Sequence, residues 1–383
     1  MDNTVLRNRF RDMFGHEGDL YFSPGRINLI GEHTDYNGGF VFPGAIDKGI
    51  TAEICRNGSR KVRLLAIDIE EDNYVEFSLD DTDKPSRHWA CYIFGVCKEL
   101  EKRGVHPGGF NAAFSGDIPL GAGLSSSAAL ESVFAFALNA MFADGRVDKF
   151  ELAKIGQATE HNYCGVKCGI MDQFASVFGR KGCLIRLDCR SLEYEYFPFN
   201  PTGYDLVLID SCVKHSLGTE YNERRESCEN AVAAMNRLFG GVETLRDADY
   251  SMLDAVKDEI SGTDYLRARY VLDEKERVLT VCDALNKGDY ELVGRKMYET
   301  HWGLSHDYTA SCPELDFLVE TARECGVTGS RMMGGGFGGC SINLVRRTLR
   351  DNFISRATRE YSRKFGIIPK VYRVITGDGS RKL

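Results

Sequence analysis

The stretch "SPGRINLIGEHTDYNGG" spans residues 23–39 and is dense in polar groups. Four glycines punctuate it, and twelve consecutive positions carry five strongly polar side chains: Arg26, Glu32, His33, Asp35 and Asn37. An ordinary surface turn needs only one or two such groups. The density of charged and amide groups therefore predicts a segment that binds a polar ligand.

Length and composition place the chain among soluble globular proteins. At 383 residues it is long for one hydrophobic core, so we expect two domains. Its residues are 43% hydrophobic and 27% charged, which is ordinary for a soluble protein. The net charge of −8 provides no general basic surface for nucleic acid or an anionic membrane. We therefore expect neither partner and allow only a local basic pocket.

The first residues, "MDNTVLRNRFRDMF", mix charged and apolar side chains and lack the hydrophobic core of a secretion signal. No later run reaches the roughly 18 apolar residues of a membrane-spanning helix. We expect a cytoplasmic protein. The thirteen cysteines are odd in number and scattered, which favours reduced thiols over a disulfide framework.

One group of side chains raises a metal site as a minor alternative. Its members are a histidine and four cysteines: His161, Cys164, Cys168, Cys183 and Cys189. Their spacing lacks the CxxC pairs that are typical of structural zinc sites, so buried thiols are the better interpretation.

The two halves of the chain differ in the secondary structure that their residue patterns predict. Short β-branched or aromatic runs in the first half, such as "KVRLLAID" and "NYVEFSL", predict strands. Charged amphipathic segments near residues 219–239, 263–286 and 314–325 predict helices in the second half. We expect a first domain of residues 1–195 and a second of residues 196–383.

A second polar segment, "PLGAGLSSSAALE", spans residues 119–131. Small residues let a ligand approach the backbone, and free N–H groups at the positive end of a helix suit a phosphate. The segment has no lysine, so it is not a P-loop, and Ser126 stands where the GxGxxG pattern needs its last glycine. A tight turn leading into a buried helix is the structural alternative.

A third segment, "RMMGGGFGGCSINLV", spans residues 331–345 and carries five glycines in the six positions from 334 to 339. Such a run is costly in chain entropy, which indicates that another group approaches its backbone. The alternative is a flexible hairpin.

Taken together, these segments resemble the three motifs of the GHMP small-molecule kinases, and the first resembles the signature of the galactokinases. The segment "ATEHNYCGVKCGIMDQFASVFG" at 158–179 is similar to the one that carries the catalytic aspartate of that family, and "EYNERRESCE" and "SCPELDFLVETA" also resemble it. The resemblance covers nearly the whole chain. It implies a two-domain α+β fold, with a first domain like the second domain of ribosomal protein S5 and a ferredoxin-like second domain. It leaves open whether the last strand returns to the first domain.

The resemblance also implies the sugar contacts. Glu32, His33 and Asp35 would hold the hydroxyls of galactose, and Gly169 and Tyr221 would complete the set. Carboxylates, an imidazole and a close backbone suit a sugar, because its hydroxyls both donate and accept hydrogen bonds. The structural alternatives are a turn cap for Glu32, a satisfied core histidine for His33 and helix packing for Tyr221.

For the chemistry, Asp172 matches the catalytic base that is proposed for the family, and Arg26 matches the arginine beside it. A guanidinium there would keep the carboxylate ionised and would stabilise charge on the transferring phosphoryl group. A buried structural ion pair is the alternative. The sequence does not decide whether Asp172 takes the hydroxyl proton or positions the hydroxyl.

The resemblance implies ATP and Mg²⁺ as well. Ser127 and Glu160 match the family's magnesium residues, with a helix cap and a surface carboxylate as alternatives. Trp89 resembles an aromatic residue near the adenine, although a core position is as good an interpretation. The phosphate cradle would consist of seven consecutive residues: Gly121, Ala122, Gly123, Leu124, Ser125, Ser126 and Ser127.

The expected activity is ATP-dependent phosphorylation of galactose at its anomeric hydroxyl. A kinase for another sugar, such as N-acetylgalactosamine, and a non-catalytic galactose sensor are the competing functions. Two departures from the family pattern leave the substrate range open: Pro43-Gly44, and the missing arginine in "GLSHDYTASCPELD". The oligomeric state is also open, with a monomer plausible.

Overall fold

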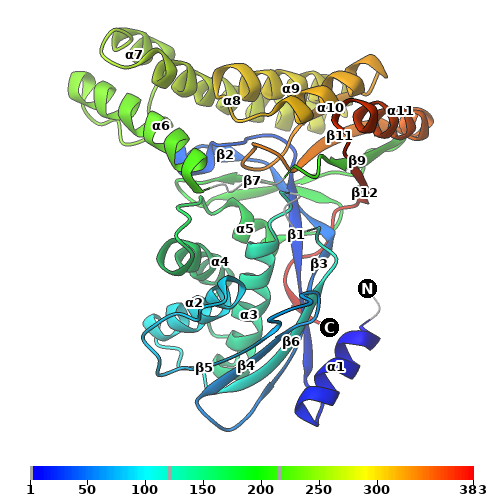
Figure 1. Ribbon diagram of the computed structural model, residues 1–383. Helices are drawn as coiled ribbons and strands as arrows, with labels where there is room; N and C mark the ends of the chain where they lie inside the picture. Colours follow the sequence, from blue (N-terminus) through cyan, green and yellow to red (C-terminus); the bar gives the residue numbers. More distant parts are fainter. Residues whose placement is uncertain (1–2, 120–122, 214–217) are drawn as a thin grey trace.

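Two long antiparallel strands, β1 (Asp19–Asn28) and β3 (Pro43–Arg56), run through the middle of the molecule (Figure 1). A computed structural model describes residues 3–119, 123–213 and 218–383. The two strands belong to a six-stranded sheet in the order β13-β1-β3-β6-β4-β5, in which only the β4–β6 pair is parallel. The other strands are β4 (Lys61–Ala66), β5 (Tyr74–Ser78), β6 (Phe110–Gly116) and β13 (Arg381–Lys382).

Helices cover both faces of this sheet. Helix α1 (Thr4–Phe14) lies on one face, and the other face carries α2 (His88–Lys102), α3 (Ser126–Ala143), α4 (Lys149–Thr159) and α5 (Met171–Phe178) (Figure 1). Within the described ranges, α3 is the one helix long and apolar enough to cross a membrane, and 72% of it is buried inside the protein. Its apolar character therefore belongs to the core, whose largest cluster includes eight of its residues.

A second, four-stranded antiparallel sheet has the order β10-β11-β9-β12. Numbered along the chain, this order reads 2-3-1-4, which is the ferredoxin-like arrangement of a split βαβ unit. Helices pack over one side of the sheet (Figure 1). The strands are β9 (Tyr204–Asp210), β10 (Gly329–Met332), β11 (Cys340–Arg346) and β12 (Lys370–Val374). The helices are α6 (Gly218–Phe239), α7 (Tyr250–Ala255), α8 (Gly262–Asn286), α9 (Tyr290–Trp302), α10 (Pro313–Glu324) and α11 (Arg347–Phe365).

Short elements join the two sheets. A three-stranded sheet consists of β2 (Phe40–Val41), β7 (Cys183–Asp188) and β8 (Tyr194–Pro198). Three single-turn helical segments are η1 (Asp35–Asn37), η2 (Glu160–Cys164) and η3 (Gly303–Asp307).

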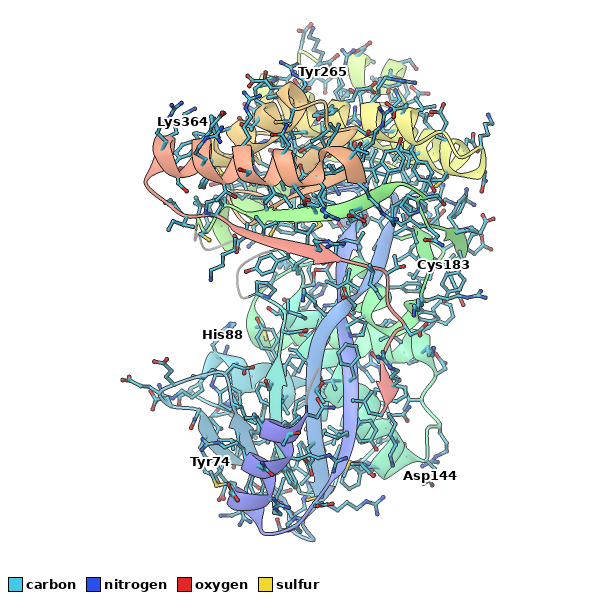
Figure 2. The ribbon with its side chains drawn as sticks, turned by 90° about the vertical axis from the view of Figure 1, so that its right-hand side faces the viewer. Tyr74, His88, Asp144, Cys183, Tyr265 and Lys364 are labelled. Carbon is cyan, nitrogen blue, oxygen red and sulfur yellow. The ribbon has the colours of Figure 1, made fainter. Side chains whose placement is uncertain are left out.

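The end of the chain returns to the first sheet. After β12 the chain passes a bridge between Thr376 and Ile46, and Lys382 then pairs with Tyr21 of β1. Figure 2 lets this path be followed from β12 down to β13. Residue 195, after which we expected the first domain to end, lies inside β8. A division of the chain near this point stays our proposal, with the C-terminal strand paired to the first sheet.

The side chain of Arg331 ties the second sheet to the end of β1. It is fully buried in β10 and donates to the backbone carbonyls of Asn28, Leu29 (2.9 Å) and Met332 (2.6 Å). It also donates to the carboxylate of Glu32 at 3.0 Å. Breaking such a pair leaves a charge and several acceptors buried without a partner, which is costly.

We expect Arg331→Met to lower the free energy of unfolding by about 3–5 kcal/mol, because it leaves the Glu32 carboxylate without its cation. Arg323→Met is the matched control, since the ion pair of Arg323 with Glu320 is exposed, and it should change stability by about 0.5 kcal/mol or less. Urea denaturation measures both. Equal losses in the two variants would show that Arg331 does not hold the sheets together.

Candidate active site

A pocket of about 500 Å³ lies where the two sheets meet. Its walls come from the three polar segments of the sequence and from α5, α6 and the residues between α4 and α5. They include thirteen of the predicted site residues: Arg26, Glu32, His33, Asp35, Gly123, Leu124, Ser125, Ser126, Ser127, Glu160, Gly169, Asp172 and Tyr221. A larger, open groove beside β7 and β8 contains none of the predicted residues. The structure therefore brings almost the whole predicted set to one place.

Arg26 and Asp172 form a bidentate ion pair at the pocket. Arg26 Nε donates to Asp172 Oδ1 at 2.7 Å, and Arg26 Nη2 donates to Asp172 Oδ2 at 2.9 Å. A shift in the β1–β3 register between Pro24 and Arg26 marks a bulge next to the arginine, and bulges commonly redirect side chains at functional sites. Burial alone would lower the pKa of Arg26, but the charges of Asp172 and Glu32 outweigh it and raise the pKa. The arginine is therefore a fixed cation.

The carboxylate of Asp172 keeps access to the pocket. Its side chain is 30% exposed, whereas that of Arg26 is 4% exposed. The hydroxyl of Ser125 donates to Asp172 Oδ2. Asp172 sits in the first turn of α5, where the positive end of the helix favours a negative charge. Among the described residues, Oδ2 accepts two hydrogen bonds and Oδ1 accepts one, so Oδ1 has an acceptor position available for a ligand hydroxyl.

Glu32 lines the pocket and also forms the buried ion pair with Arg331. Its Oε1 accepts from Arg331 Nη2 and from the backbone N–H of Gly334 at 2.9 Å. Gly334 begins the glycine-rich loop, so Glu32 anchors that loop beside the pocket. The glycine run therefore does have another group against its backbone, as its sequence predicts.

His33 is held as a neutral ring. Burial, with a smaller contribution from the charge of Arg224, lowers the pKa of His33 to about 3. Its Nδ1 lies 2.8 Å from the hydroxyl of Tyr36, and its ring packs against Tyr308 and Tyr221, with centroid distances of 4.7 and 5.4 Å. Its Nε2 is buried and has no hydrogen-bond partner within the described residues. A buried ring nitrogen that has no protein partner and lies on a pocket wall is well placed to form a hydrogen bond with a ligand.

Gly169 lies directly against Asp35. A Cβ atom on Gly169 would come within 1.9 Å of Asp35 Oδ2, so only glycine fits there. Burial raises the pKa of Asp35 to about 7, and the negative charge of Asp172 adds to this effect. The two carboxylates therefore share the pocket at a cost in free energy, which a polar ligand would reduce.

The described part of the predicted phosphate loop ends at the start of α3. Leu124 accepts a hydrogen bond from the backbone N–H of Arg26 at 3.2 Å, and a Cβ atom on Gly25 would lie 2.7 Å from the same carbonyl oxygen. Helix α3 begins at Ser126, so its positive end faces the pocket. Gly121 and Ala122, which belong to the predicted cradle, lie outside the described residues.

Ser127 and Glu160 line the same side of the pocket. Burial raises the pKa of Glu160 to about 7, a hydrogen bond from Ser127 opposes this rise, and the charge of Asp172 supports it. A hydroxyl and a carboxylate next to a helix start are hard oxygen donors of the kind that Mg²⁺ takes in addition to phosphate oxygens and waters. The residues present therefore fit a magnesium ion bound with a nucleotide.

Two other interpretations of the sequence concern Trp89 and the alternative metal site around His161. Trp89 does not line this pocket; it is partly buried and packs on Phe114 at a centroid distance of 5.6 Å, and its place near the adenine stays a prediction. In the part of the chain that the structure describes, no group of three or more His, Cys, Asp or Glu side chains could hold a metal. His161 instead interacts through Nε2 with the carbonyl of Cys168 at 2.8 Å.

The sequence did not predict that Arg331, Tyr36 and Tyr308 hold the residues of the pocket in place, Arg331 through Glu32 and the two tyrosines through His33. Each lies in a segment that the sequence analysis singles out, but the residue pattern of that segment does not indicate which side chain the residue contacts. Arg331 opens the glycine-rich segment, Tyr36 follows Asp35, and Tyr308 belongs to "GLSHDYTASCPELD".

Comparisons with known proteins agree with this arrangement. Three family models match: the galactokinase galactose-binding signature at residues 8–56, the GHMP kinases N terminal domain at 91–180 and the GHMP kinases C terminal at 282–363. The curated galactokinase of Clostridium acetobutylicum is 40% identical over 386 residues, with 99% of each chain covered. That of Bacillus subtilis is 39% identical, covering 99% of this chain and 98% of the relative.

Solved structures give the same result. The structure of Lactococcus lactis galactokinase complexed with galactose is 36% identical, has a TM-score of 0.96 and is covered over 100% of both chains. Methanococcus jannaschii mevalonate kinase, at 18% identity and a TM-score of 0.66, shares the fold. The two-domain GHMP fold that the sequence predicted is thereby confirmed.

The raised pKa of Asp35 predicts a pH dependence of stability without substrates. An unfolded aspartate ionises near pH 4, whereas Asp35 in the folded protein ionises near pH 7. The folded state therefore holds the extra proton between these values, and stability is lost as the pH rises through 7. We expect Asp35→Asn to reduce the fall in melting temperature between pH 5 and pH 8. Asp258→Asn, on the exposed surface, should leave it unchanged, and parallel curves for all three proteins would contradict the assignment.

Proposed function

Because the chain belongs to the galactokinases of the GHMP kinase family, we propose that it transfers the γ-phosphoryl group of ATP to the anomeric hydroxyl of galactose. The observation that carries this proposal is the Arg26–Asp172 pair, which lies between the sugar-type segment and the start of α3. A kinase needs its acceptor hydroxyl and its phosphate at one point. This pocket has carboxylates and an imidazole on one side and a helix start on the other.

In the proposed reaction, the sugar is held by groups that the folded protein leaves available. Asp35 and the free Nε2 of His33 face the pocket, and Glu32 lines it. Gly169 lets the backbone approach Asp35, and Tyr221 packs beside the ring of His33 at 5.4 Å. A sugar whose hydroxyls match these groups pairs them all, whereas a misplaced hydroxyl leaves a buried polar group without a partner.

Asp172 then acts on the anomeric hydroxyl. Its Oδ1 has a free acceptor position, so it can hold the hydroxyl and receive its proton as the oxygen–phosphorus bond forms. The bond between the γ-phosphorus and the bridging oxygen breaks, and ADP leaves. Arg26 remains charged and stabilises negative charge near the transferring group. Ser125 and Arg26 fix the orientation of the carboxylate.

Magnesium would be held by Ser127 and Glu160. When bound, the ion supplies positive charge to the phosphate oxygens. The described cradle residues Gly123, Leu124, Ser125 and Ser126 adjoin these two, and the amides at the start of α3 favour an anion. We also propose a cytoplasmic location, because all thirteen cysteines are free thiols, as in a reducing compartment.

Galactose specificity is the direct test of this proposal. With MgATP, ADP production should be at least about 10²-fold more efficient with galactose than with glucose, because the fourth hydroxyl of glucose is misplaced. N-acetylgalactosamine in the same panel tests the competing sugar. Equal efficiency with glucose, or a preference for N-acetylgalactosamine, would contradict the substrate assignment.

Asp172→Asn should lower turnover by at least about 10²-fold, because it keeps the volume of the side chain but removes the charge and the proton acceptor. The matched control is Asp205→Asn, which breaks a remote pair with Arg350 at 2.7 Å and should leave turnover within about twofold. Thermal melting must first show that both variants fold. A folded Asp172→Asn protein that binds both substrates and turns over at the parent rate would make Asp172 structural.

Glu160→Gln should raise the magnesium concentration needed for half-maximal activity by about tenfold or more, because a neutral amide is a weaker ligand than a carboxylate. Glu151→Gln, which alters a surface pair with Lys154, is the control. Titration of activity with Mg²⁺ after chelation measures both. An unchanged requirement in Glu160→Gln removes this residue from the proposed metal site.

A further inference from the structure

A line of buried polar side chains runs away from the pocket behind His33. His33 Nδ1 lies 2.8 Å from the hydroxyl of Tyr36, and that hydroxyl lies 2.6 Å from the hydroxyl of Tyr308. The hydroxyl of Tyr308 lies 3.4 Å from the thiol of Cys228, which accepts from the amide of Asn37 at 3.6 Å. We call these five residues the His33 relay. They come from the residues before η1, from η1 itself, from α6 and from the residue after η3, so the relay exists only in the folded protein.

One end of the relay has a fixed direction. The amide nitrogen of Asn37 donates to the backbone carbonyl of His33 at 2.9 Å, and a carbonyl can only accept. This contact fixes the orientation of the amide, so its second N–H points to Cys228 as a donor. Donation can then continue in one direction, from Cys228 to Tyr308, from Tyr308 to Tyr36 and from Tyr36 to His33 Nδ1. Hydrogen bonds that run in one direction strengthen one another.

The other end of the relay accommodates the same direction. A neutral imidazole carries one proton, so if Nδ1 accepts from Tyr36, the proton is on Nε2. Nε2 is buried on the pocket wall and has no hydrogen-bond partner within the described residues. A proton on Nε2 is therefore available to a ligand hydroxyl.

From this geometry we propose that Tyr36, Tyr308 and Cys228 are positioning residues that fix His33 as the Nε2–H tautomer, so that His33 donates a hydrogen bond to a hydroxyl of the sugar. The choice of galactose as that sugar rests on the proposed function. The pocket then offers a fixed donor beside the carboxylates of Asp35 and Asp172. A ligand hydroxyl can satisfy this donor without any rearrangement of the protein, which is the benefit of a fixed tautomer.

The tautomer can be measured without substrates. Protein labelled with ¹⁵N-histidine contains eight histidines, and the signals of His33 are identified by their loss in His33→Gln. We expect a protonated Nε2 and a bare Nδ1 in the parent protein. In Tyr36→Phe and Tyr308→Phe, the Nδ1–H form should become populated, because the donor to Nδ1 is lost or no longer oriented. A Nδ1–H tautomer in the parent, or unchanged signals in both variants, would overturn the proposal.

Kinetics test the consequence for the sugar. Tyr36→Phe and Tyr308→Phe should raise KM for galactose about tenfold and leave kcat within about twofold, because the contact holds the sugar in both the ground and transition states. Cys228→Ser should recover most of the KM increase seen in Cys228→Ala, since a hydroxyl both donates and accepts. The control is Tyr265→Phe, whose hydroxyl donates to Asp254 at 2.6 Å on the outer side of the helical layer (Figure 2).

These measurements separate failure of the relay from failure of the proposed function. If the chain does not phosphorylate galactose, the kinetic assay fails for every variant while the ¹⁵N signals still decide the tautomer. If galactose is phosphorylated and the relay variants match Tyr265→Phe in KM, the proposal is overturned. A variant that fails to fold leaves the parent tautomer as the deciding result.

Discussion

The buried ion pair between Arg331 and Glu32 is the contact on which the arrangement of the pocket depends. Because Arg331 also donates to backbone carbonyls at the end of β1, the first and third polar segments can satisfy their buried groups only when both sheets are in place. The same carboxylate of Glu32 accepts from Gly334, so the glycine-rich loop is fixed together with the sugar-type segment. One buried contact therefore couples the folding of the two sheets to the formation of the pocket.

The pocket is electrostatically unfavourable until it is filled. Asp35, Asp172 and Glu160 face it together, and the pKa of both Asp35 and Glu160 is raised to about 7 by burial and by neighbouring negative charge. Arg26 is the cation that holds Asp172, and among the described residues no hydrogen bond or ion pair joins it to the other two carboxylates. The binding of sugar hydroxyls and of a cation would reduce the repulsion between these carboxylates. Grouping them in one pocket therefore lowers the stability of the protein without ligands but favours ligand binding.

Local chemistry in the sequence was sufficient to predict the pocket segments, and the resemblance to a family predicted the Arg26–Asp172 pair, whose members are 146 residues apart. Local chemistry in the sequence was not sufficient to predict contacts that form only in the folded chain. Nothing near Tyr308 indicates that its hydroxyl meets that of Tyr36, and the short strand at the C-terminus carries no pattern that predicts pairing with β1. Trp89 could not be assigned for a different reason, because a large aromatic residue suits a protein core and a ligand site equally well. In the structure it packs on Phe114.

We propose that galactose binds with its anomeric hydroxyl at the available acceptor position of Asp172. The most direct measurement is a crystal structure of the protein with galactose, magnesium and a non-hydrolysable ATP analogue. We expect the anomeric oxygen to lie about 2.6–3.2 Å from Asp172 Oδ1, in line with the γ-phosphate at the start of α3. An anomeric oxygen that meets Asp35 or Glu32 instead, with Asp172 in contact only with Arg26 and Ser125, would contradict it.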